Sequence, residues 1–306
     1  MSALWPSGVA VAMTATLLLP TNGRAQARAD TTGYTSAECP SCTEWNVPTA
    51  PVRVHGNTYY VGTRGLAAIL IVSPRGSILI DGGLPESAPQ IVANIRTLGF
   101  LVEDVRLLVN SHTHYDHAGG LAALQRMTGA RVVASPRAVA ALTAGRATAD
   151  DPQFASALPF PPVLKVDALA DGDTLRVGTI FVVAHSTPGH TPGGTSWSWR
   201  SCEDSGCLDL VYADSQTPIS SDSFRFTGST VYPTVLQDFE RGFRVLETLS
   251  CDILLTPHPS VSNFWDRLGG VRGAPLVDRE GCRRYAAGAR QALNRRLSAE
   301  SATVPR

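Results

Sequence analysis

Residues 111–117, Ser-His-Thr-His-Tyr-Asp-His, constrain the fold and chemistry of this chain more than any other stretch. The apolar residues 105–109 before them are predicted to form a buried strand, because they are mostly branched and show no helical period. Residues 121–127 after them are predicted to form a helix. The stretch therefore lies on a strand-to-helix loop, where α/β scaffolds usually carry functional side chains.

The spacing of the ligand-type side chains in this loop, HxHxDH, predicts two metal sites. Neutral imidazole and carboxylate are ligands that zinc prefers. Alternation along an extended loop places His112 and His114 on one side, whereas Asp116 and His117 follow where the chain turns and can face a second point. Four ligands are too many for one catalytic zinc that keeps an open position. The chain has seven histidines and three fall in this loop, which disfavours an incidental, solvated segment.

Two later blocks resemble the partners of this motif in a known family. The family is indicated by Thr187–Thr195 (TPGHTPGGT), Thr256-Pro257-His258, Asn110-Ser111 and the strand Trp197-Ser198-Trp199. With the HxHxDH motif, these stretches make the chain resemble the subclass B3 enzymes of the metallo-β-lactamase superfamily. The resemblance runs from about Glu44 to Leu297.

The resemblance implies an α/β fold of the four-layer αβ/βα type, with two packed mixed sheets flanked by helices and the metals at one edge between the sheets. The sequence pattern places strands and helices in both halves but does not fix their pairing. Strands are expected at residues 59–62, 67–72, 77–80, 105–109, 131–134, 174–177, 179–184, 194–200, 208–213 and 253–255. Helices are expected at residues 87–98, 121–127, 136–143, 239–249 and 283–297.

The resemblance also implies which residues hold two zinc ions. The first ion would be held by His112, His114 and His190, and the second by Asp116, His117 and His258. A water shared by two divalent cations loses a proton near neutral pH, and the metal-bridged hydroxide would attack the lactam carbonyl. Asp116 would also orient this nucleophile. The predicted function is zinc-dependent hydrolysis of the β-lactam amide of penicillins, cephalosporins and carbapenems, which confers antibiotic resistance.

Substrate recognition is predicted in residues 212–217, Tyr-Ala-Asp-Ser-Gln-Thr. This stretch has neither the metal-binding cysteine nor the substrate-binding lysine of the best-known subclass. Ser215 and Thr217 match hydroxyl positions that hold the substrate carboxylate in subclass B3, although an ordinary Ser/Thr turn stays open. The long loop 144–162 and residues 222–228, which could cover the substrate, would set substrate preference.

Two other functions stay open. A lactonase or glyoxalase-II-like thioesterase of the same superfamily would use the same five histidines and Asp116, and would bridge its metals through an aspartate near Asp214. A zinc-binding protein without turnover is disfavoured by the substrate-side hydroxyls. Asp81 could orient a ligand histidine or form a simple turn, whereas His55 and His185 match no ligand position and are expected to be packing or surface residues.

Residues 1–27 are predicted to be a signal peptide, followed by a single domain over 28–306 with an irregular tail at 28–43. The apolar stretch 9–20 is too short to span a bilayer, and Ala25-Gln26-Ala27 is typical of a cleavage site. The usual positive charge before the stretch is missing, so a disordered or buried N-terminus stays open. We expect a periplasmic or secreted monomer.

The six cysteines agree with export, because disulfides persist in oxidising compartments. Sequence alone does not choose their pairing. The resemblance supports Cys251–Cys282 and Cys202–Cys207, which leaves Cys39 and Cys42 to each other or as a redox or zinc pair. The formal net charge of +0 does not favour nucleic acid or an anionic membrane as a partner. The expected partner is a small-molecule β-lactam.

Overall fold

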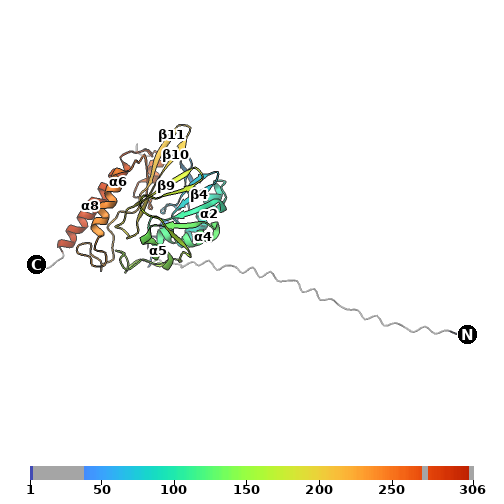
Figure 1. The fold of residues 1–306 in the computed structure, drawn as a ribbon, viewed down its shortest axis with the longest axis horizontal. Coiled ribbons are helices and arrows are strands. Elements are labelled where there is room, and N and C mark those ends of the chain that lie inside the picture. Colours follow the sequence, from blue (N-terminus) through green and yellow to red (C-terminus); the bar gives the residue numbers. More distant parts are fainter. Residues whose placement is uncertain (3–37, 271–274, 303–306) are drawn as a thin grey trace. The chain divides into compact units, whose positions relative to one another are not determined.

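Apolar residues on both faces of consecutive strands produce two mixed β-sheets at the centre of this fold (Figure 1). The computed structural model describes residues 1–2, 38–270 and 275–302. The chain divides into residues 1–30 and 31–306, and every element below belongs to the second unit. The predicted signal peptide therefore lies, from residue 3 on, outside the described residues.

The first sheet has seven strands, whose spatial order is the order of the sequence. They are β1 (Val52–His55), β2 (Thr58–Tyr60), β3 (Ile69–Ser73), β4 (Gly76–Ile80), β5 (Val105–Val109), β6 (Arg131–Ala134) and β7 (Val166–Ala168). Strands β1 to β4 pair antiparallel, and β4 to β7 pair parallel. Parallel neighbours are connected through helices, as βαβ units require.

The second sheet has five strands in the order β12-β11-β10-β9-β8. They are β8 (Thr174–Val177), β9 (Ile180–Ser186), β10 (Thr195–Glu203), β11 (Gly206–Tyr212) and β12 (Ile253–Leu255). Only the β11–β12 pair in this sheet is parallel. Strand β12 thus ends at the same edge as β11, which brings the residues after both strands together.

Helices cover the outer face of each sheet. Helices α2 (Ala88–Thr97), α4 (Leu121–Thr128) and α5 (Pro136–Ala144) share a core with the first sheet, and α6 (Val235–Thr248) and α8 (Gly281–Ala302) share one with the second. Short helices are α1 (Cys42–Trp45), α3 (Tyr115–Ala118) and α7 (Phe264–Leu268), with 3-10 turns η1 (Pro85–Ser87) and η2 (Val102–Asp104). The predicted four-layer αβ/βα arrangement is confirmed.

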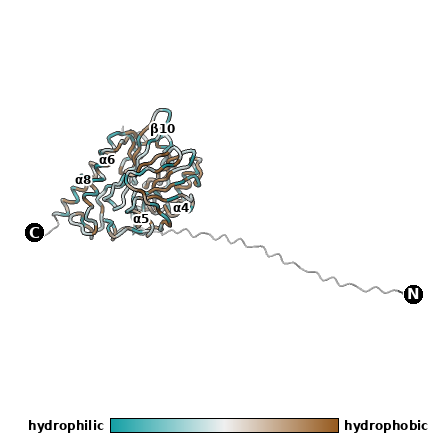
Figure 2. Tube along the Cα trace, in the orientation of Figure 1, coloured by the Kyte–Doolittle hydropathy of each residue, from teal (hydrophilic) through white to brown (hydrophobic). Residues whose placement is uncertain are grey.

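The strands are apolar on both faces because each face meets a different core. In β3, Ile69 and Ile71 pack between the two sheets, whereas Leu70 packs under the helices of the first layer. The indole rings of Trp197 and Trp199 fill the space between the sheets from the β10 side. Figure 2 shows the hydrophobic residues gathered along these inner strands.

The predicted strands and helices are all present, and the pattern missed β1, β7 and the short helices. Strand β7 has only two apolar residues, and α1, α3 and α7 are too short to show a period. Residues 28–43 were predicted to be irregular, but Cys42 starts α1, because the Cys39–Cys42 disulfide closes the turn before it. Among the described helices, none is both long and apolar enough to cross a bilayer.

Three disulfides connect the six cysteines: Cys39–Cys42, Cys202–Cys207 and Cys251–Cys282. The two pairs that the resemblance supported are confirmed, and the CxxC cysteines pair with each other. Cys251 lies before β12 and Cys282 in the first turn of α8, so this bond anchors the long C-terminal helix to the second sheet.

Residues 222–228 were considered as a loop that could cover the substrate, but their two aromatic side chains lie in the protein core. The rings of Phe224 and Phe226 are buried and pack with Phe239 of α6 in the core below α8. The carboxylate of Glu300, near the end of α8, accepts hydrogen bonds from the backbone N–H groups of Phe226 and Thr227 at 3.0 and 2.9 Å. This loop therefore packs against α6 and is hydrogen-bonded to the C-terminal part of α8.

Replacing Glu300 by glutamine is expected to lower the free energy of unfolding at pH 7 by about 1 kcal/mol, because charge-assisted hydrogen bonds are lost. Burial would raise the pKa of Glu300, but the hydrogen bonds from Thr227, Phe226 and Arg296 lower it to about 2. The stabilisation is present above the ordinary carboxyl pKa and should fade as the pH falls towards about 2. Urea unfolding of both proteins between pH 7 and pH 2 measures this difference.

The matched control is Glu103→Gln, since Glu103 is exposed. Equal effects of the two substitutions, or an effect of Glu300→Gln that does not shrink in acid, would contradict the assignment.

Candidate metal centre

The HxHxDH loop leaves the end of β5 and enters α3. His114 is the extended residue before α3, and Asp116 and His117 lie within its single turn. His112 and His114 therefore alternate on an extended backbone while the next two candidates project from a helix, as the spacing predicted. All four side chains are buried.

Asp81 holds the start of this loop from the end of β4. Its fully buried carboxylate accepts hydrogen bonds from the N–H and the hydroxyl of Ser111, each at 2.7 Å, and from the hydroxyl of Tyr212 at 2.7 Å. Its φ of 63° is unusual for a residue with a side chain. Burial raises the pKa of Asp81. The carboxylate thus fixes the residue before His112 and contacts no candidate ligand histidine by a hydrogen bond.

One group of donor atoms comes from segments of both sheets. Nitrogens of His112, His114 and His190 lie within 4.8 Å of one another. His190 comes from the connection between β9 and β10, where Gly189 has a φ of 136° and faces the ring of Phe239. A Cβ at Gly189 would lie 2.6 Å from that ring, so this turn needs glycine.

In each of these imidazoles one nitrogen contacts a carboxylate or a backbone carbonyl, and the other nitrogen is the one available to an ion. Such partners fix the orientation and tautomer of metal-binding histidines. The contacts are His112 Nδ1 with Asp214 Oδ1 at 2.8 Å, His114 Nε2 with Asp151 Oδ2 at 3.2 Å, and His190 Nδ1 with the carbonyl of Thr217 at 2.8 Å. The three histidines therefore present Nε2, Nδ1 and Nε2, respectively. At His190 that second nitrogen, Nε2, also lies 3.5 Å from Nε2 of Gln153.

A second group of donor atoms lies beside the first. Oδ2 of Asp116 is 3.2 Å from Nε2 of His117 and 3.3 Å from Nε2 of His258, and the two Nε2 atoms are 3.2 Å apart. Zinc–nitrogen and zinc–oxygen bonds of about 2.0–2.1 Å in a tetrahedron put the ligands about 3.3–3.4 Å apart. The triangle formed by these three atoms has this size, so the three donors fit one ion.

Burial and neighbouring charges favour, at His112, His190 and Asp116, the protonation states that metal binding requires. Burial, with the nearby His114, lowers the pKa of His190 to about 3. Burial and the neighbouring histidines also hold the pKa of His112 well below its usual value. Burial alone would raise the pKa of Asp116, but His117 and His258 hold it well below the usual range. These shifts favour neutral imidazoles at His112 and His190 and a carboxylate anion at Asp116 near pH 7. At His114 burial alone would lower the pKa, but the carboxylate of Asp151 raises it.

Asp214 lies on the outer side of the His112 ring. Its fully buried carboxylate contacts Nδ1 of His112, which points away from the Nε2 that faces the donor group. Its other oxygen faces Gly194, where an added Cβ would lie 2.3 Å away. Burial raises the pKa of Asp214 well above its usual value. In this position the carboxylate orients a histidine and does not lie between the two donor groups.

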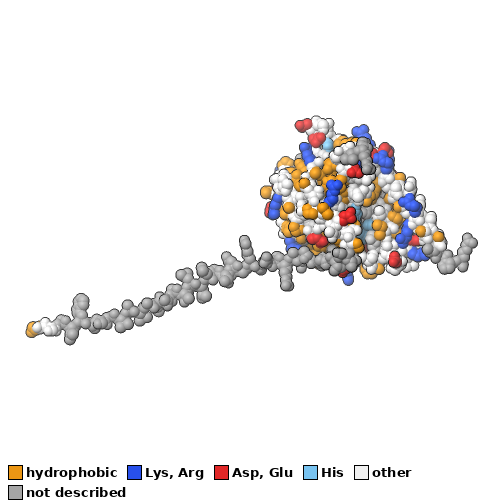
Figure 3. Space-filling model, turned by 180° about the vertical axis from the view of Figure 1, so that it is seen from behind, with side chains coloured by type: hydrophobic (Ala, Val, Ile, Leu, Met, Phe, Trp, Pro, Cys, Tyr) orange, Lys and Arg blue, Asp and Glu red, His pale blue; other side chains and the backbone are white. Residues whose placement is uncertain are grey.

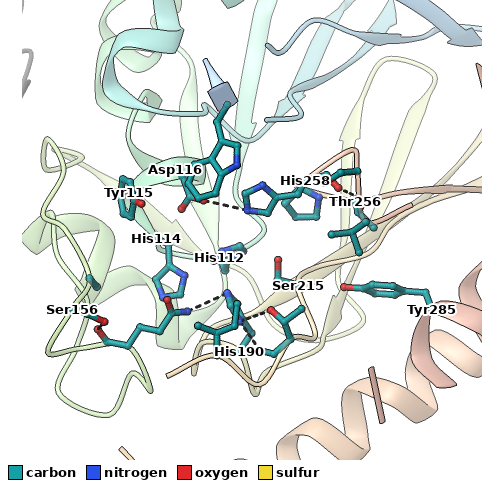
Figure 4. A pocket seen from close by; sticks show the side chains of 18 residues that line it. His112, His114, Tyr115, Asp116, Ser156, His190, Ser215, Thr256, His258 and Tyr285 are labelled. Atoms are coloured by element: carbon teal, nitrogen blue, oxygen red, sulfur yellow. Dashed lines mark hydrogen bonds and ion pairs between the residues drawn. The ribbon is translucent and has the colours of Figure 1, made fainter. Parts of the chain in front are cut away.

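Both donor groups open into one cavity of about 380 Å³ (Figure 4). Ser215 and Thr217, predicted to bind substrate, line it. Its wall also contains Trp45, Tyr115, Gln153, Ser156, Ala157, Ile219, Thr256, Pro257, Ser260, Val261 and Tyr285. None of the described residues that line it is lysine or arginine. On the face seen in Figure 3, acidic and basic side chains are interspersed.

Comparison with known proteins shows the family to which this chain belongs. Residues 61–235 match the model of the metallo-β-lactamase superfamily. The Rm3 metallo-β-lactamase is 49% identical, with a TM-score of 0.83 over 86% of this chain and 99% of that one. MEM-A1, a subclass B3 enzyme from a soil metagenome library, is 46% identical, with a TM-score of 0.82 over 85% and 100% of the two chains. The chain belongs to the subclass B3 metallo-β-lactamases.

This metallo-β-lactamase also matches two curated proteins over a shorter stretch. A hydroxyacylglutathione hydrolase from Bradyrhizobium sp. (strain ORS 278) is 31% identical over 40% of this chain and 38% of its own length. A probable metallo-hydrolase from Burkholderia pseudomallei (strain 1710b) is 27% identical over 51% of this chain and 48% of its own. The chain thus spans less than half the length of each.

Several residues of this metallo-β-lactamase site were missed by the sequence analysis. Asp151 and Gln153 belong to the loop 144–162, which was expected to be functional but whose path no local pattern fixes. Trp45 lies far away in the sequence, and its ring centroid is 4.9 Å from that of His258. As expected, His185 and His55 lie outside the site: His185 contacts the hydroxyl of Ser198 at 2.7 Å, and His55 faces Glu203.

Proposed function

We propose that this enzyme uses two zinc ions to hydrolyse the β-lactam amide of penicillins, cephalosporins and carbapenems. One observation carries the proposal: two groups of donor atoms open into the same cavity. The first group is formed by three histidines, and the second is the triangle of Asp116, His117 and His258 with sides of 3.2–3.3 Å. The relatives named above support the substrate class, since Rm3 and MEM-A1 are described as metallo-β-lactamases.

In this proposal the two donor groups become two ligand sets. One zinc is held by His112, His114 and His190, and the other by Asp116, His117 and His258. Bound zinc supplies a Lewis acid and a water of lowered pKa. The pKa of Asp116 is held low, so its carboxylate stays ionised. It can therefore accept a hydrogen bond from the attacking water and orient that water.

The substrate carboxylate is assigned to the hydroxyls of Ser215 and Thr217. They line the cavity, and none of the lining residues that the structure describes supplies a cationic side chain. Hydroxyl donors can satisfy the carboxylate oxygens, as buried or partly buried anions require. His190 Nδ1 contacts the carbonyl of Thr217, so the substrate-binding segment is also tied to the first ligand set.

A thioesterase is the alternative, because one curated relative is a hydroxyacylglutathione hydrolase. It would require an aspartate between the metals. The nearest candidate, Asp214, contacts the outer nitrogen of His112, which favours the lactamase.

The deciding experiment measures hydrolysis of a chromogenic cephalosporin, a carbapenem and a glutathione thioester by the purified protein. We expect rapid lactam turnover that a chelator abolishes and zinc restores, with slow or no thioester cleavage. Thioester cleavage without lactam turnover would refute the proposal in favour of the alternative.

We also propose that the enzyme is exported, by a signal peptide ending near Ala27, and acts as a monomer that confers resistance outside the cytoplasm. The apolar stretch 9–20 and the three disulfides support export. N-terminal sequencing of protein recovered from the periplasm or medium tests the cleavage site.

A further inference from the structure

Tyr285 is a partly buried phenol in the cavity wall to which the proposed function gives no role. It projects from α8, one turn after Cys282, and its hydroxyl points towards Ser215 in Figure 4. The hydroxyl donates a hydrogen bond to the carbonyl of Asp214 at 2.9 Å and accepts one from the backbone N–H of Gln216 at 3.0 Å.

These two backbone groups belong to the peptide units on either side of Ser215. Peptide units are planar, so the φ and ψ angles of Ser215 alone determine how the two planes are related. One oxygen atom bonded to both planes therefore restrains both angles. The direction in which the Ser215 side chain leaves the backbone follows from that restraint.

We propose that Tyr285 is a positioning residue that aims the hydroxyl of Ser215 at the substrate carboxylate. This inference rests on the substrate-binding role assigned to Ser215 above. Tyr285 acts through Ser215, because both partners of its hydroxyl are backbone atoms of the residues that flank the serine.

The elements around Tyr285 are suited to this role. The Cys251–Cys282 disulfide ties the start of α8 to the segment before β12, so the phenol projects from an anchored helix. The segment's ends have their own restraints: the N–H of Asp214 donates to the hydroxyl of Ser196 at 2.9 Å, and the carbonyl of Thr217 contacts His190. The phenol thus supplies a restraint at the centre of the segment. A site on rigid elements is already ordered before the substrate binds, so little conformational entropy is lost on binding.

The phenol remains protonated near neutral pH, because the pKa of a tyrosine is ordinarily well above neutrality and burial raises the pKa of Tyr285 further. Its hydroxyl hydrogen is therefore always present for the carbonyl of Asp214, and pH changes near neutrality should leave the restraint intact.

Tyr285→Phe removes the hydroxyl and keeps the ring. We expect the KM for a chromogenic cephalosporin to rise about three- to ten-fold, as the loss of one or two ordinary hydrogen bonds predicts, with kcat within about two-fold of the parent. Zinc content, measured by mass spectrometry, should be unchanged. The matched control is Tyr59→Phe, in β2 with its ring against Phe100, which should leave KM unchanged.

A double-mutant cycle with Ser215→Ala separates positioning from simple structural support. If Tyr285 acts through Ser215, Tyr285→Phe should change KM by less than about two-fold once the serine hydroxyl is absent. The inference is overturned if Tyr285→Phe leaves KM unchanged, if its full effect persists in the Ser215→Ala protein, or if the variant loses zinc or no longer folds. Absence of lactam turnover in the parent would instead refute the proposed function, and the inference with it.

Discussion

Replacing Asp116 by asparagine is expected to lower kcat/KM for a β-lactam by about three orders of magnitude. A metal ion stabilises the transition state by several kcal/mol, and a loss of about 4 kcal/mol corresponds to this factor. Asparagine keeps the shape of the side chain and removes its charge. In the triangle with His117 and His258, Asp116 is the only anion. Its loss should weaken the second ligand set far more than the first, whose ligands are all histidines.

Zinc content and turnover measured on the same preparation test this expectation. The variant should retain about one zinc per chain at a zinc concentration that gives the parent about two. Asp104→Asn is a suitable control, because Asp104 is a surface carboxylate paired with Arg106. A variant that binds two zinc ions and keeps the parent's turnover would remove Asp116 from the mechanism.

Asp214→Asn is expected to weaken zinc binding to the first ligand set by about 100-fold, the upper end of the range for partners of ligand histidines. The fully buried carboxylate holds Nδ1 of His112 at 2.8 Å. An amide can present its N–H₂ to that nitrogen and stabilise the wrong tautomer. The second ligand set, which includes no contact with Asp214, should keep its affinity.

Titration against a chelating fluorescent indicator resolves the two affinities. A loss confined to one site supports an orienting role, whereas an equal loss at both sites would mean that Asp214 lies between the metals, as in the thioesterase alternative. Gly194→Ala is a second way to disturb the contact between Asp214 and His112. The added Cβ would lie 2.3 Å from Oδ2 of Asp214 and must displace the carboxylate. It should reproduce the loss at the first site without removing a charge.

The parts of the site that could be predicted from sequence are those encoded within a few residues. The HxHxDH loop, His190 and His258 each follow a strand, and strand ends that meet at one edge bring them together. The strands were predictable for the same reason, since strands between two cores read as continuous apolar runs. Their pairing into two sheets was implied only by the family resemblance.

Contacts made across the fold could not be predicted. Asp151 reaches His114 from a loop rich in proline, and Trp45 reaches His258 from the N-terminal segment, with no local pattern to indicate either path. The burial of Phe224 and Phe226 was not predicted, because exposed aromatic side chains and buried ones look alike in sequence. What places Phe224 and Phe226 in the core is their packing against α6 and the capping carboxylate of Glu300, a residue more than seventy positions away.

The donor atoms come from both sheets: the loop after β5 belongs to the first, and the β9–β10 connection and the end of β12 belong to the second. An ion held here is thus a cross-link between the two halves of the molecule, much as a disulfide would be. Its binding free energy adds to the free energy of folding. Metal supply should therefore govern how long each molecule survives proteolysis as well as how fast it works. Zinc starvation is expected to reduce the amount of enzyme and its activity together.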